Sequence, residues 1–216
     1  MKGYFESHPF WGRQSPLSAL TGIGLIIMAS SRFAFALVGA GALLWVFGLT
    51  ALIFSCARPI MPSRGKMIIL LFISTFLCGS LMLIISVLNP LLLMGTAFFF
   101  LLIPPCCLGT GFFEAAESVD PLEAVYRALL DALCLGGIIL AVALIREPLG
   151  MGTLSVPGGI QGIIELFDNS QANNILPARI FSVSAGGLLI LGYGIALFRY
   201  FRALNGNNPR ELSEED

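Results

Sequence analysis

Five cysteines are the residues of this chain with the most distinctive chemistry, and two of them are adjacent. They stand at positions 56, 78, 106, 107 and 134. Four of the five lie in long apolar stretches, and an odd number argues against a framework of disulfide bonds. Because a buried cysteine usually packs as a small apolar residue, we interpret Cys56, Cys78 and Cys134 as packing residues.

The pair Cys106 and Cys107 differs from the others because it follows two prolines. Pro104 and Pro105 each remove a backbone N–H donor, and glycines follow at positions 109 and 111. Interrupted backbone inside a bilayer is tolerated only where protein or a cavity covers it. A thiol at such a break is placed like a ligand at the end of a half-helix. Two interpretations of Cys107 remain open, a ligand and a packing residue.

Acidic residues follow the prolines. Those between positions 114 and 123 predict a solvated loop, with a helix that begins at Asp120-Pro121, since an aspartate suits the N-cap and a proline the first helical position. Asp131 lies a turn into the next apolar stretch, where ionisable groups are costly and often functional. It could serve an ion pathway, pair with Arg127 four residues earlier, or mark the membrane interface.

The composition indicates the environment of these side chains. Of the 216 residues, 56% are hydrophobic and only 12% are charged. Soluble domains carry roughly 25% charged residues, so a water-facing surface cannot be built here. A formal net charge of −1 argues against nucleic acid as a partner, because phosphate binding needs a basic face. We therefore expect an all-α polytopic protein whose surroundings are a lipid bilayer.

Uncharged stretches predict six transmembrane helices, because about 20 apolar residues cross a bilayer. The uncharged run Met67–Phe113 is twice that length and must turn back, most simply at Asn89-Pro90. Arg146 and Glu147 end the fifth span, and we expect them to fix that helix end and the following loop. The spans are Gln14–Ser31, Phe33–Ala57, two within Met67–Phe113, about Ala128–Ile145 and about Ile180–Phe198.

Six spans place both termini on one side, and the basic residues indicate which side that is. With the termini in the cytoplasm, nine of the twelve lysines and arginines fall inside and three outside, as the positive-inside rule requires. We predict a multi-pass protein of a bacterial inner membrane. The outer loop at about 150–177 contains a PGG turn and the run GIIELF, which we interpret as a short helix on the surface.

The first and fourth spans are both interrupted by helix-breaking residues, and both lead into a span rich in glycine and alanine. Interrupted segments at corresponding positions of two halves are typical of an inverted repeat with a site at its interface. We expect a cytoplasmic tail at 1–13, a three-helix repeat at 14–90, a second at 91–204 and a disordered cytoplasmic tail at 205–216.

Several motifs resemble the Rnf/Nqr family of membrane subunits. CLGTGFFEAAES is similar to the family's C-x-x-x-G-R-A-E-A-F-A-S, and LIREPLGMGTL to R-E-x-x-G-S-G-T-L. SPLSALTGIGLIIMASS resembles the family's first interrupted helix, and LLILGYGIALFRYFR its last span. The similarity covers nearly the whole chain and is greatest to the RnfE (RsxE) and NqrD branch, whose termini are cytoplasmic.

The resemblance implies a role in an ion-translocating electron-transport complex. It implies a related partner subunit of opposite topology, RnfA- or NqrE-like, besides other Rnf/Nqr-type subunits. It also implies a [2Fe–2S] cluster shared between the two, held by one thiolate from each interrupted helix. Cys107 matches one family ligand, with Cys106 in place of the usual asparagine. Glu114 falls at a family position, and Asp131 matches a family x-D-G, so both are candidates for the ion pathway.

One family ligand is missing, which leaves two functions open. The first cluster cysteine falls at Gly24, which cannot bind iron. Cys106 is a poor substitute because adjacent helical residues point about 100° apart, and Cys78 and Cys134 are geometric alternatives. No nucleophile–base pair, phosphate loop or chelating His/carboxylate set occurs, so the chain is at most a non-catalytic subunit of an oxidoreductase. The alternative is a cluster-free paralogue, acting as a scaffold or as a transporter of an ion or small solute.

Overall fold

Apolar helices make up most of the chain, at the positions that the uncharged stretches predict. The computed structural model describes residues 16–57, 65–109, 120–158, 163–168 and 179–205. A 3-10 turn, η2 (Arg179–Phe181), and a two-stranded sheet complete this part of the chain. The helices are α2 (Pro16–Ala29), α3 (Phe33–Ala57), α4 (Lys66–Leu88), α5 (Pro90–Gly109), α7 (Pro121–Met151) and α8 (Ser184–Asn205).

Four of these helices, α3, α4, α5 and α7, are long and apolar enough to cross a membrane. Within the described residues, α2 covers 14 residues, which rise about 21 Å against a hydrocarbon core of about 30 Å, and Ser184–Leu197 of α8 forms a shorter apolar helix. The expectation of an all-helical polytopic membrane protein is therefore confirmed in outline. Six spans and two inverted repeats stay predictions. The expected interruption of the first and fourth spans was wrong at the level of secondary structure, because α2 is continuous over its described residues and α5 remains helical through Pro104 and Pro105.

The surface of α4 and α5 is suited to lipid and not to water. Phe72 and Val87 of α4 are 75% and 84% exposed, and Met94 and Phe98 of α5 are similarly exposed. Contiguous apolar patches of this kind are rare on soluble monomers. In a bilayer they need no cover, since lipid tails are as apolar as the side chains.

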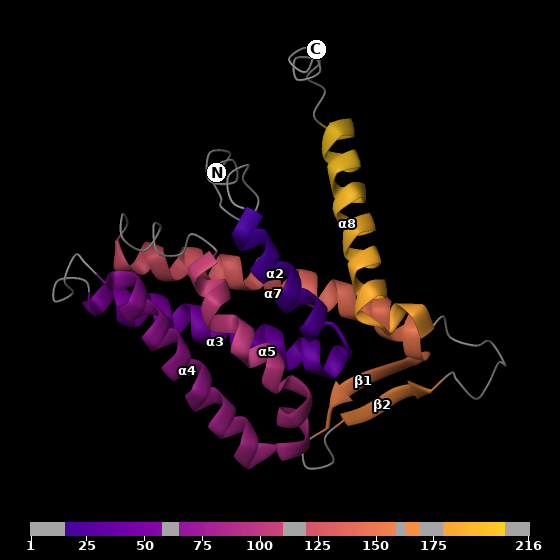
Figure 1. Ribbon diagram of the computed structural model, residues 1–216, viewed down its shortest axis with the longest axis horizontal. Helices are drawn as coiled ribbons and strands as arrows, with labels where there is room; N and C mark the ends of the chain where they lie inside the picture. Colours follow the sequence, from indigo (N-terminus) through magenta and orange to yellow (C-terminus); the bar gives the residue numbers. More distant parts are fainter. Residues whose placement is uncertain (1–15, 58–64, 110–119, 159–162, 169–178, 206–216) are drawn as a thin grey trace.

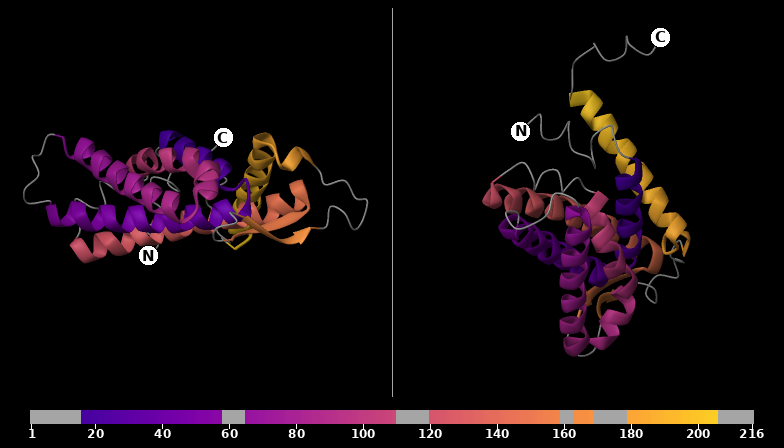
Figure 2. Two further views of the ribbon diagram at one scale, coloured as in Figure 1. Left: turned by 90° about the horizontal axis from the view of Figure 1, so that it is seen from below. Right: turned by 60° about the vertical axis from the view of Figure 1, so that its left-hand side comes forward.

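The core is built around α3 and α7, which pack side by side along most of their length (Figures 1 and 2). They run antiparallel, because Gly48 faces Leu129 whereas Gly136 faces Ala40. The buried face of α7 repeats small residues every four positions, at Ala124, Ala128, Ala132 and Gly136. Small residues let membrane helices approach closely, so this repeat explains the long contact.

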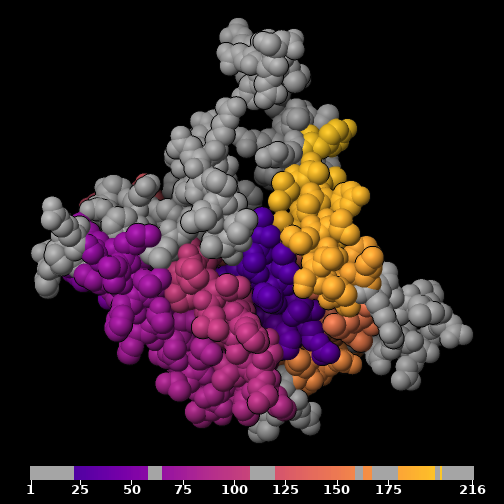
Figure 3. Space-filling view, in the orientation of Figure 1, coloured from indigo at the N-terminus to yellow at the C-terminus, as the bar shows by residue number. Residues whose placement is uncertain are grey.

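The remaining helices form a layer on this pair. In the space-filling view α5 lies between α4 and α2, and α8 stands at the far edge beside α2 (Figure 3). The predicted turn between α4 and α5 is confirmed at Asn89. Its side-chain Oδ1 accepts a hydrogen bond from the Leu92 N–H at 3.1 Å, and Pro90 follows as the first helical residue, which is a favourable helix start.

A β-hairpin replaces the surface helix expected in the outer loop. Strand β1 (Thr153–Pro157) pairs antiparallel with β2 (Ile163–Asp168), with a register shift between Leu154 and Ser155. The helix prediction was therefore wrong for the GIIELF run. β-branched residues in both segments favour extended backbone, and pairing satisfies the N–H and C=O groups along the edge that the two strands share. The hairpin lies at one end of the α3–α7 pair (Figure 2).

The start of α8 provides a test of this packing, with a matched control on the same helix. A Cβ atom at Gly186 would lie 2.2 Å from the backbone oxygen of Ile180, whereas one at Gly192 would meet nothing within 4 Å. We expect Gly186→Ala to lower the thermal unfolding midpoint of the purified chain in detergent, at a cost of about 1–3 kcal/mol for overpacking. Gly192→Ala should leave the midpoint unchanged or raise it. Equal midpoints for the two variants would contradict this packing.

Candidate functional site

Cys106 and Cys107 lie in the last turns of α5, immediately after Pro104 and Pro105. Both residues are fully buried. They belong to the same hydrophobic core as Leu25 of α2. The thiols that the sequence marks as candidates are therefore enclosed by protein at a helix segment that lacks two backbone donors.

The other three cysteines separate into two kinds. Cys78 on α4 is buried, and its Sγ donates a hydrogen bond to the backbone oxygen of Phe100 at 3.0 Å. Cys56 and Cys134 are exposed on the surface of the chain. The interpretation of these three as packing residues inside the chain therefore holds for Cys78 alone, and even there it misses the hydrogen bond.

Gly24 determines how far this chain fits a [2Fe–2S] cluster. It lies on α2, which packs against α5, and a Cβ atom added to it would meet nothing within 4 Å. Within the described ranges no group of three or more His, Cys, Asp or Glu side chains could hold a metal ion. Of the two positions that the resemblance implies as ligands, Cys107 carries a thiol and Gly24 carries no donor atom, so the residues present fit the cluster at one position alone.

Of the two acidic candidates, Asp131 lies on α7. It is half-buried, in the third turn of the helix. Arg127 donates a hydrogen bond to Glu123 at 2.5 Å, four residues earlier. The predicted helix start is confirmed, since Asp120 is the N-cap and Pro121 the first helical residue. Glu114 lies outside the described residues.

Arg146, near the end of α7, binds the ends of two other helices. It is 3% exposed. Its Nη1 donates to the backbone oxygen of Ile27 at 2.9 Å and to the hydroxyl of Ser30 at 3.2 Å. Its Nε and Nη2 donate to the backbone oxygens of Phe181 and Ser182 at 2.9 and 2.8 Å. One guanidinium therefore joins the last turn of α2 to the segment that leads into α8.

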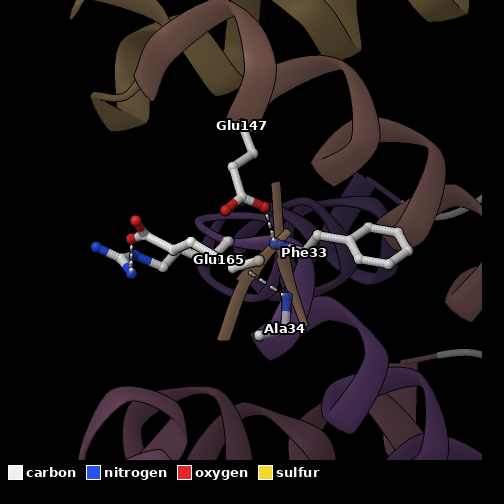
Figure 4. Close-up of polar contacts among 6 residues, drawn as sticks. Phe33, Ala34, Glu147 and Glu165 are labelled. Carbon is white, nitrogen blue, oxygen red and sulfur yellow. Dashed lines mark hydrogen bonds and ion pairs between the residues drawn. The ribbon is translucent and has the colours of Figure 1, made fainter. Parts of the chain in front are cut away.

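Glu147, the next residue, binds the start of α3 (Figure 4). Its Oε2 accepts a hydrogen bond from the Phe33 N–H at 2.6 Å, and the hydroxyl of Ser155 in β1 accepts one from the Ala34 N–H at 3.3 Å. The other carboxylate oxygen of Glu147, Oε1, is buried without a hydrogen-bond partner among the described residues. The ion pair of Arg32 with Glu165, at 3.7 Å, links the same turn to β2.

The two side chains match the helix ends that they bind. The last carbonyls of a helix carry partial negative charge and its first N–H groups partial positive charge. Arg146 meets the carbonyl end of α2, and Glu147 meets the amide end of α3. We call these two residues the Arg146–Glu147 clamp. The sequence predicts that they fix the end of α7, but their partners on α2 and α3 are distant in sequence, and no local signal marks them.

Fold and site together define a class: a helical polytopic membrane protein with buried thiols at a proline-containing helix segment. No protein-family model matches the chain. Its curated relatives confirm the resemblance to Rnf/Nqr-type subunits. The chain is 29% identical over 184 residues to the D subunit of the Na(+)-translocating NADH-quinone reductase of Chlamydia felis, with 80% of this chain and 79% of the relative covered. The D subunits of the same reductase in Chlamydia abortus and Chlamydia caviae match over the same length at 28% and 29% identity.

Truncation of the buried Arg146 should destabilise the protein far more than truncation of the exposed Arg127. We expect Arg146→Ala to lower the free energy of unfolding by about 3–5 kcal/mol, because the removal of one partner leaves buried groups unpaired. Arg146→Lys should recover only part of the loss, since an ammonium cannot reproduce the fork of donors. Arg127→Ala is the control: its ion pair with Glu123 is exposed and contributes about 0.3–0.5 kcal/mol. Thermal unfolding in detergent measures the three variants. Similar midpoints for Arg146→Ala and Arg127→Ala would contradict the clamp.

Proposed function

We propose that this chain is a membrane subunit of an ion-translocating electron-transport complex of the Rnf/Nqr type. In that role it helps relay electrons across the membrane, coupled to movement of Na⁺ or H⁺. The match to the D subunits of Na(+)-translocating NADH-quinone reductases over four fifths of the chain carries the proposal. The enclosed thiols of Cys106 and Cys107 support it, because iron–sulfur clusters are held by cysteine thiolates.

The proposal includes a partner and an orientation. The chain packs against a homologous subunit of opposite topology in a bacterial inner membrane, with both termini in the cytoplasm. Nine of twelve basic residues on one side support the orientation. Six consecutive residues of α8, from Gly192 to Leu197, are exposed, so every face of this part of the helix is available to lipid or to another subunit.

In this proposal Cys107 is the one thiolate that this chain directs toward a shared [2Fe–2S] cluster. When bound, such a cluster supplies one-electron transfer, which side chains alone do not provide. The core around Cys106 and Cys107 keeps water away from the thiols. Asp131, with Glu114, supplies carboxylates for the ion pathway, because an acid at membrane depth lowers the cost of a passing cation.

A second candidate function rests on Gly24. A chain that supplies one ligand in place of two suits a cluster-free paralogue, which would act as a scaffold or as a transporter of an ion or small solute. Iron content separates the two functions, because only the first requires a cluster.

The cluster proposal is tested by iron and acid-labile sulfide in the chain purified together with its natural membrane partner. We expect both in the wild-type complex and their loss in Cys107→Ser, because serine is a poor substitute for a soft thiolate ligand. Cys56→Ser, at an exposed cysteine, is the control and should retain both. Absence of iron and sulfide from an intact wild-type complex would contradict the cluster proposal and favour the second function.

Gly24 allows the converse experiment within the same measurement. Because nothing lies within 4 Å of an added Cβ atom, Gly24→Cys should fold and retain or increase the iron content. Gly24→Ser is the matched control for volume and should not increase it. A gain of iron in both variants would show that the thiol at this position is irrelevant.

The ion pathway is tested by ion uptake into proteoliposomes that contain the complex. We expect Asp131→Asn to slow uptake about tenfold, which corresponds to about 1.4 kcal/mol of lost stabilisation along the path. Glu123→Gln, at an exposed residue of the same helix, is the control and should transport at the wild-type rate. Undiminished uptake by Asp131→Asn would reject the role of this carboxylate.

A further inference from the structure

Pro104 leaves one buried carbonyl of α5 without its usual partner. In an α-helix the oxygen of residue i accepts from the N–H of residue i+4, and the residue four positions after Phe100 is Pro104, which has no N–H. Phe100 is fully buried, and its ring packs edge-to-face on that of Phe99. In an apolar environment this oxygen needs a donor from elsewhere.

Cys78 supplies that donor from the neighbouring helix. Its Sγ lies 3.0 Å from the backbone oxygen of Phe100 and donates the S–H to it. Cys78 is 3% exposed and belongs to the same core as Phe100, Cys106 and Cys107. The contact joins α4 to α5 at the carbonyl that the proline frees, 22 residues away along the chain.

We propose that Cys78 is a positioning residue for the buried thiols of Cys106 and Cys107, because it replaces the backbone donor that Pro104 removes from α5. A helix bends at a proline because a hydrogen bond is missing, so the direction of α5 beyond Pro104 depends on what binds the freed oxygen. This proposal rests on the proposed function in one respect, namely that the thiols which Cys78 positions have a role in binding a cluster.

The same hydrogen bond argues against Cys78 as the missing cluster ligand. A ligand cysteine is a thiolate, and a thiolate has no proton to donate to the Phe100 oxygen. A Cys78 that acts as a donor in this way is therefore the protonated thiol. Its role is to hold α5, the helix that carries Cys107. Cys78 therefore does not supply the thiolate ligand that is missing at Gly24.

The experiment is a double-mutant cycle between Cys78 and Pro104 in the chain purified with its natural membrane partner. The variants are Cys78→Ala, Cys78→Ser, Pro104→Ala and the double change Cys78→Ala with Pro104→Ala. Cys56→Ala, at an exposed cysteine, is the matched control. Three quantities are measured: the infrared S–H stretching band, the rate at which Cys106 and Cys107 are alkylated, and the iron content.

The spectroscopic result reports the hydrogen bond directly. The band lost in Cys78→Ala should have the lowered frequency of a hydrogen-bonded thiol. In Pro104→Ala it should move to the free-thiol frequency, because the new backbone N–H at position 104 takes the Phe100 oxygen. A free-thiol band in the wild type, or a band that does not move in Pro104→Ala, would overturn the proposal.

The alkylation rates report positioning. Cys78→Ala should expose Cys106 and Cys107 to alkylation about fivefold faster, the factor expected from one lost hydrogen bond of about 1 kcal/mol. Cys78→Ser should restore the slow rate, since a hydroxyl also donates. In the Pro104→Ala background Cys78→Ala should have little further effect. A serine variant as reactive as the alanine variant, or an equal effect in both backgrounds, would reject the role.

Iron content keeps the two proposals separable. A wild-type complex without iron, but with the shifted S–H band and the coupling to Pro104, would remove the cluster and leave the positioning role in place. A complex with iron whose S–H band and alkylation rates show no coupling would remove the positioning role and leave the cluster proposal intact.

Discussion

The arrangement of the helices depends on a pair of adjacent, oppositely charged side chains at one end of α7. Arg146 and Glu147 are almost fully inaccessible, and desolvating two charges is expensive unless each is well hydrogen-bonded. The guanidinium finds four acceptors, and the carboxylate finds the first N–H of α3. The two helix ends of opposite sign offset part of that cost, while the Oε1 of Glu147 has no hydrogen-bond partner among the described residues. Because one dipeptide serves both sides of the α2–α3 turn, the short helix α2 cannot shift without breaking these bonds.

This constraint links the end of the molecule that carries the β-hairpin to the buried thiols. The described part of helix α2 has 14 residues, and its position is set by the bonds at its last turn and by its packing on α5. The Arg146–Glu147 clamp fixes the last turn of α2. Helix α2, which contains Gly24, packs against α5, which contains Cys107. A second restraint acts from α4, where Cys78 binds the Phe100 oxygen. The thiol-bearing end of α5 is therefore held from two neighbouring helices.

Sequence reasoning predicted the features that depend on local chemistry. The helices, the Asn89-Pro90 turn and the Asp120-Pro121 helix start follow from apolar run length and capping preferences, which involve residues a few positions apart. The hairpin was missed because GIIELF has the apolar content of either a helix or a strand, and only pairing with Thr153–Pro157 decides. The hydrogen bonds of Arg146 and Cys78 were missed because their partners are distant in sequence. A proline within a helix is the one local signal that a carbonyl four residues earlier needs an outside donor, and it points to Phe100 but not to Cys78.

Gly24 and Pro104 illustrate two ways in which a missing group is accommodated. Pro104 removes the backbone donor of a buried carbonyl, and the chain itself supplies a replacement from Cys78. Gly24 removes a side chain that the fold does not need, because the space beside it is left open and no described residue extends into it. A structural deficit is thus repaired within the chain, whereas the deficit at Gly24 concerns only what the chain binds. Because of that difference, a chain with glycine at position 24 can keep the membrane architecture that the resemblance implies. Whether it binds a cluster depends instead on how many thiolate ligands it supplies.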